Sequence, residues 1–102
     1  DLLAVAPGER AVVIDQSDAF AVTRLAGPGV RDVLARLTPL DCRKAVFPEG
    51  RTARTLVGHM TAQVTPVEPD AFEIMVFRSM AGALVHDLGR VMEHVAGRAR
   101  IG

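Results

Sequence analysis

The chain is poor in several residue types, and each shortage excludes a class of protein. Cys42 is the only cysteine, so an internal disulfide framework is excluded and a reducing compartment, the cytoplasm, is expected. Tyrosine and tryptophan are absent, which leaves four phenylalanines for stacking on a flat cofactor ring. We therefore expect no self-contained cofactor pocket.

The chain also has no excess of positive or negative charge and no long apolar run. The 12 basic residues balance the 12 acidic ones, so the chain lacks the positive field on which nucleic-acid binding depends. No apolar stretch is long enough to cross a bilayer, and no signal-peptide pattern is visible. What remains is a chain of 102 residues with 49% hydrophobic content, enough for one core and a single domain over 1–102.

Hydrophobic periodicity predicts an α+β fold. Residues 10–15 and 19–25 are typical of a β-hairpin, and 56–65 alternates like a strand with one wet face, His59 included. A helix should begin at Pro28 and stop before Pro39, with its apolar face formed by Val30, Val33, Leu34 and Leu37. The order ββαββα results, a ferredoxin-like layer of antiparallel or mixed sheet with two helices on one face.

The last strand and helix form one run from Phe72 to Leu84. Phe72, Ile74 and Val76 share one face of the strand at 71–77, and Ser79 is typical of a helix N-cap. The helix should span about 80–96 and stop at Gly97. Its main buried stripe is expected at Met80, Leu84, Leu88, Val91 and Val95.

Two features of this run suggest a contact surface. Met75 and Phe77 should point to the sheet face without helices, where either a partner or an N-terminal region missing from this chain would cover them. Gly82 and Gly89 stand in the helix interior, in a row with Ala96, and allow close approach by the sheet below or by another subunit. The candidate interface residues are Phe77, Arg78, Gly82 and Gly89.

Catalytic and metal candidates are weak. His59 has no carboxylate at helpful spacing, and Arg90 between His86 and His94 opposes a metal cation. Cys42 stands beside Arg43 and Lys44, which favour thiolate, but it has no positioned base. We therefore expect no catalytic, cofactor-binding or metal-binding residue in this chain.

Two further groups of polar residues have a structural interpretation. The pairs Asp15 with Asp18 and Glu68 with Asp70 lie in predicted turns, where carboxylates commonly bond the backbone. The segment 27–29, Gly-Pro-Gly, with Arg24 and Arg31, could hold an anion, but a simple helix start is the preferred interpretation because no phosphate-loop pattern accompanies it.

Three blocks carry a resemblance to a known family: 17–29, the segment RDVLARLTPLD at 31–41, and the strand and helix at 70–88. In this order and spacing the chain resembles the C-terminal part of the gamma subunit of heterotetrameric sarcosine oxidase, so an N-terminal part of that subunit is expected to be missing. More distantly, the fold resembles folate-binding domains of aminomethyltransferases.

The resemblance implies a non-catalytic accessory subunit of a complex that oxidatively demethylates sarcosine to glycine, peroxide and a one-carbon unit, linked to tetrahydrofolate. It implies alpha, beta and delta subunits as partners, chiefly alpha, with FAD, FMN, NAD and zinc held by those partners and none by this chain. Two alternatives stay open: a small folate-binding or one-carbon module, and a stand-alone homo-oligomer pairing through its sheet face.

Overall fold

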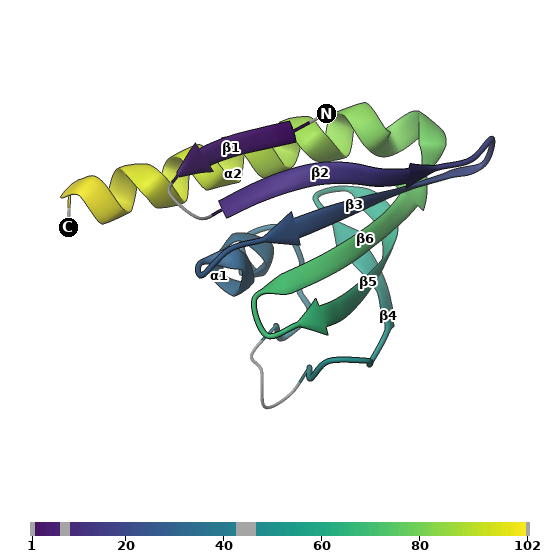
Figure 1. The fold of residues 1–102 in the computed structure, drawn as a ribbon, viewed down its shortest axis with the longest axis horizontal. Coiled ribbons are helices and arrows are strands. Elements are labelled where there is room, and N and C mark those ends of the chain that lie inside the picture. The colour runs from purple at the N-terminus through teal and green to yellow at the C-terminus, as the bar shows by residue number, and fades with distance from the viewer. Residues whose placement is uncertain (1, 7–8, 43–46, 102) are drawn as a thin grey trace.

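The computed structural model describes residues 2–6, 9–42 and 47–101, with side chains at 11–42 and 47–93. The elements in chain order are β1 (Leu2–Ala6), β2 (Glu9–Gln16), β3 (Phe20–Ala26), α1 (Val30–Ala35), β4 (Ala53–Val57), β5 (Met60–Glu68), β6 (Ala71–Phe77), the 3-10 helix η1 (Arg78–Met80) and α2 (Ala81–Ile101). All strand pairs are antiparallel, and they build a six-stranded sheet in the order β1-β2-β3-β6-β5-β4 (Figure 1).

One face of the sheet, the inner face, carries the core. Alternate residues of β6, namely Phe72, Ile74 and Val76, are buried as predicted, because the two-residue period of a strand sends them to the same side. Both helices pack on this face, and Figure 1 shows α2 running alongside β1 and β2. The helical residues that join the sheet in this core are Val30, Val33, Leu34, Leu84, Leu88 and Met92. The expected α+β class, with two helices on one face of an antiparallel sheet, is confirmed.

The predicted order ββαββα was wrong in its number of strands. The alternating segment at 56–65 is a hairpin, because β4 and β5 meet at a two-residue turn in which Val57 pairs with Met60. Gly58 has a φ of 63°, and no non-glycine residue among those described has a positive φ, which is the pattern of a type II′ turn. β1 adds a further strand at the other edge. His59 therefore lies in a turn and not on a strand face.

The helix boundaries also differ from the prediction. Ser79 is not an N-cap: it lies inside η1, whose N-cap position is Phe77 and has no side-chain cap bond. Helix α1 begins at Val30 after a turn that contains Pro28, and α2 continues past Gly97 to Ile101.

The buried stripe of α2 starts later than predicted. Met80 is 41% exposed, because it lies in η1 before the α-helix begins, while Leu84 and Leu88 are buried and Val91 is half-buried. Met92, at 1% exposure, continues the stripe one helical turn after Leu88. The side chain of Val95 lies outside the described residues.

Candidate functional site

The sheet face opposite the helices, called the outer face below, is the candidate functional surface. Both helices described lie on the inner face, so this side is not covered by either of them. Strand register places Val22, Met75, Gln63 and Arg54 in one row across four strands of the outer face. Apolar and polar side chains therefore mix on it, as on the surface of a non-obligate interface.

Large apolar side chains stand exposed on the outer face. Phe77 is 55% exposed and Phe20 is 40% exposed, and they are register partners on β6 and β3. Their rings stack with centroids 5.5 Å apart at an interplanar angle of 20°. Leu56, on β4, is 49% exposed. The prediction that Met75 and Phe77 point to the side without helices is confirmed: Phe77 is exposed and Met75 is half-buried.

A hollow of about 160 Å³ lies next to the phenylalanine pair. It is lined by Phe20, Arg54, Thr61, Ala62, Gln63, Met75, Val76 and Phe77, which come from four adjacent strands. Pockets that enclose a small molecule commonly measure about 300–1,000 Å³, so this hollow suits a single inserted side chain better than a cofactor.

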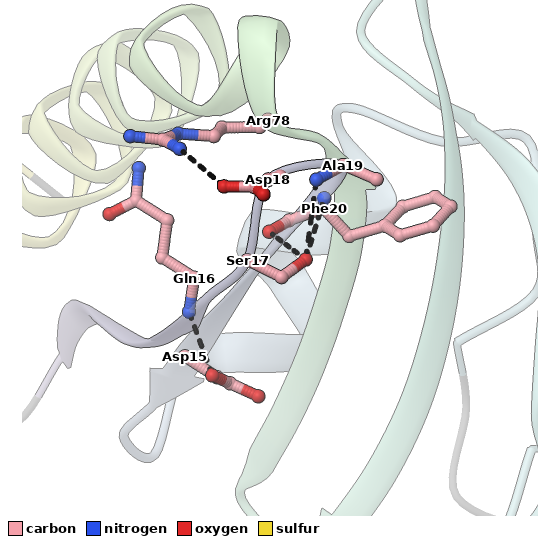
Figure 2. A network of polar contacts seen from close by, with 7 residues as sticks. All are labelled: Asp15, Gln16, Ser17, Asp18, Ala19, Phe20 and Arg78. Atoms are coloured by element: carbon pink, nitrogen blue, oxygen red, sulfur yellow. Dashed lines mark hydrogen bonds and ion pairs between the residues drawn. The ribbon is translucent and has the colours of Figure 1, made fainter.

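Arg78 lies where β6 passes into η1, beside the turn between β2 and β3 (Figure 2). Its backbone N–H donates to the carbonyl of Ala19 at 2.9 Å, and its Nη1 lies 3.8 Å from Oδ1 of Asp18. The Ser17 hydroxyl accepts from the N–H groups of Ala19 and Phe20 and so fixes the turn. These bonds place Phe20 next to Phe77, but the exposed ion pair itself contributes at most about 1 kcal/mol.

Helix α2 carries the two glycines predicted at an interface. Gly82 is exposed, and a Cβ added there would meet nothing within 4 Å. Of the two alternatives for close approach, packing by the sheet is therefore wrong for Gly82, which is the second residue of α2 and not in its interior. The side of α2 that packs on the sheet is formed by Leu84 and Leu88. Gly89 is half-buried, and Ala96 has a side chain outside the described residues. The four candidate residues are therefore divided between the junction of β6 with η1, where Phe77 and Arg78 lie, and helix α2.

Cys42 does not have the environment of a nucleophile. It is buried, and its thiol lies 3.5 Å from the carbonyl of Leu40. Burial raises the pKa of the thiol, an effect to which Asp41 adds and which the positive charge of Arg31 opposes. Loss of hydration therefore outweighs the charge of Arg31. The influence predicted for Arg43 and Lys44 stays a prediction. Arg43 and Lys44 lie outside the described residues.

The anion site considered around 27–29 is not formed by its two arginines. Arg31 is an internal connector: Nη1 donates to the carbonyls of Cys42 at 2.6 Å and Phe47 at 3.4 Å, and Nε donates to that of Pro69 at 3.2 Å. Its guanidinium also lies 4.9 Å from the ring centroid of Phe72. Arg24 pairs with Glu68 at 3.2 Å. Both guanidinium groups therefore serve the fold.

The remaining candidates do not assemble into a catalytic or metal centre. Oδ1 of Asp15 accepts from the backbone N–H of Gln16 at 2.8 Å, so this carboxylate bonds the backbone as predicted, but Asp15 lies in β2 and not in a turn. Glu68 also lies in a strand, β5, and its carboxylate pairs with Arg24. His86 is exposed on α2, and the side chain of His94 lies outside the described residues. Within the described part of the chain no three His, Cys, Asp or Glu side chains could hold a metal together, and no helix is long and apolar enough to span a membrane.

Phe20 and Leu56 are outer-face residues that the sequence did not reveal as such. Phe20 becomes part of the surface because β3 pairs with β6, and Leu56 does so because β4 turns back at Gly58. Both depend on strand pairing, which alternation alone does not specify.

Comparison with known proteins finds a solved structure with a similar fold. No protein-family model matches the chain, and no curated protein matches it. Among solved structures it is similar to a chain of the heterotetrameric sarcosine oxidase from Corynebacterium sp. U-96 in complex with pyrrole 2-carboxylate, with a TM-score of 0.75 and 16% sequence identity. The match covers 94% of this chain and 65% of that one. At this identity the likeness shows the fold alone. The chain thus has a fold that also occurs in a heterotetrameric sarcosine oxidase.

Proposed function

We propose that this chain is a non-catalytic accessory subunit of a sarcosine oxidase-type complex, equivalent to the C-terminal part of the gamma subunit. The observation that carries the proposal is the outer face with its stacked Phe20 and Phe77, which neither of the helices described in this chain covers. Exposed aromatic side chains around a small hollow are typical of the centre of a protein interface. The shared fold with a chain of such a complex supports the choice of partner.

In this proposal the catalytic groups belong to the other subunits. FAD, FMN, NAD and zinc would be held by alpha, beta and delta, and the outer face would contact chiefly alpha. The alternative of a folate module is disfavoured, because the chain has no tyrosine or tryptophan to stack on a flat ring and the hollow beside its two exposed phenylalanines measures only about 160 Å³. Self-association of two copies through the same face is the remaining alternative, and the experiment must distinguish it from binding to the other subunits.

The test is purification of the tagged chain from its host under gentle conditions, with mass identification of co-purified subunits and a visible absorbance spectrum for flavin. We expect larger subunits and flavin absorbance with the unaltered chain. The double variant Phe20→Thr, Phe77→Thr should lose both, since threonine keeps strand propensity but removes the stacked rings.

The control variant is His86→Gln, which changes an exposed side chain on α2 and should retain the partners. Recovery of the chain alone, as a dimer that the double variant converts to a monomer, would overturn the proposal in favour of self-association. Co-purification that survives the double variant would show that the outer face is not the interface.

A further inference from the structure

A second cavity, which we call the polar cleft, is formed by three segments that lie far apart in the sequence. It measures about 590 Å³, within the common range of small-molecule sites, and lies between the end of α1, the turn from β4 to β5, and the middle of α2. Its lining residues are Arg36, Leu37, Gly58, His59, Asp87, Arg90 and Val91. None of them lines the hollow of the outer face.

Backbone contacts hold the three segments together. The N–H of Gly58 donates to the carbonyl of Leu37 at 2.7 Å, which fixes the turn against the end of α1. Asp87 and Arg90 are three residues apart on α2 and so project from the same side of the helix. A Cβ at Gly58 would lie 2.8 Å from Oδ2 of Asp87, so the glycine allows this carboxylate to lie against the turn.

The polar side chains of the cleft make little contact with the rest of the fold. Among the described residues, the side chains of His59, Asp87 and Arg90 have no hydrogen-bond or ion-pair partner, although Asp87 is half-buried. Arg36 has a single ion pair with Asp32, at 3.9 Å, too long for a strong one. Among the side chains that line the cleft, two guanidinium groups stand against one carboxylate, because Asp32, the distant partner of Arg36, does not line it. The surface that a ligand would meet is therefore net positive and favours an anion.

We propose that the polar cleft binds a small hydroxycarboxylate. The ligand carboxylate would pair with the guanidinium groups of Arg36 and Arg90, whose planar donors match it, and the ligand hydroxyl would donate to Asp87. Leu37 and Val91 supply apolar surface for the carbon chain. An amino acid would place an ammonium against Asp87 in place of the hydroxyl. Titration with alanine, which differs from lactate in that one group, tests this alternative, and tighter binding of alanine than of lactate would overturn the proposal.

The experiment is a titration of the 15N-labelled chain with lactate and with propionate, which differ by one hydroxyl, followed by the backbone amide signals of Gly58, His59 and Arg90. We expect lactate to bind in the millimolar range and propionate about fivefold more weakly, since one hydrogen bond is lost. Arg90→Gln should weaken lactate about tenfold. Asp87→Ala should bring the two affinities close to equality.

The matched control is Arg54→Gln, an arginine of the outer face, which should leave lactate binding unchanged. Dispersed amide spectra show that each variant is folded. Equal binding of lactate, propionate and inorganic phosphate would overturn the proposal, because the cleft would then be a plain anion patch. Lactate binding that survives Arg90→Gln would overturn it as well. Neither outcome depends on the assembly of a complex.

Discussion

At the scale of single residues, the burial of Cys42 couples folding to alkaline pH. The folded thiol has a pKa above its ordinary value of 9.0, chiefly because burial removes hydration. Below pH 9.0 both states keep the proton and the full stability is present. Above it the unfolded thiol ionises first, so the free energy of unfolding should fall as pH rises toward the folded pKa. Urea unfolding at about pH 7.5 and about pH 10 measures this loss.

The control for Cys42 is the Cys42→Ala variant. Its free energy of unfolding should fall less between the same two pH values, because only the other titrating groups then contribute. An equal loss of unfolding free energy in both proteins would show that folding does not protect the thiol from ionisation. Native labelling with a thiol reagent gives an independent measure, and it should be slow until the chain unfolds.

Arg31 is expected to stabilise the fold more than any exposed arginine. It joins α1 to the carbonyls of Cys42 and Pro69, so Arg31→Met should lower the free energy of unfolding by about 2–3 kcal/mol while keeping an aliphatic chain. Arg31→Lys should recover less than half of this, because an ammonium lacks the planar fork. Arg54→Met, at an exposed position, should change it by less than about 0.5 kcal/mol. Similar losses of unfolding free energy in Arg31→Met and Arg54→Met would contradict the role of Arg31 as an internal connector.

At the scale of elements, the turn between β4 and β5 depends on glycine. Gly58→Ala should lower the free energy of unfolding by about 1–3 kcal/mol, because its φ of 63° strains a Cβ and the Cβ would meet Asp87. Gly50→Ala is the control: its φ is 84°, but nothing lies within 4 Å of the added Cβ. Urea unfolding should show the smaller loss for Gly50→Ala, and the reverse order would exclude the contact with Asp87.

The sequence predicted those elements whose signal is local. Alternation in 71–77 and the spacing of Val30, Val33 and Leu34 were enough for β6 and α1, and their buried residues were correct. The hairpin at Gly58 was missed because a two-residue turn interrupts the alternation so briefly that 56–65 also fits one strand. The consequence was large, since Leu56 and Met60 lie on opposite faces.

At the scale of the whole molecule, both candidate sites combine distant segments. The outer face was predicted in part, through Met75 and Phe77 on β6, but the contribution of Phe20 follows from the pairing of β3 with β6. The polar cleft has no local signature: His59 and Asp87 line one cavity only because the turn and α2 both lie at the end of α1. The pattern of residues along one strand predicts which side chains share a face, whereas a cleft between distant segments can be recognised only once their packing is known.

Since the core lies on the inner face and the proposed interface on the outer one, assembly and folding should be separable in this molecule. Phe20→Thr with Phe77→Thr should lower the free energy of unfolding by no more than about 1.5 kcal/mol, since these rings are largely exposed and lose mainly their mutual stacking. Leu34→Ala, at a fully buried position of α1, should cost about 2–5 kcal/mol. Urea unfolding of the isolated chain compares them. If the double variant lost as much as Leu34→Ala, the phenylalanine pair would belong to the core, and its loss of partners would be an effect of unfolding.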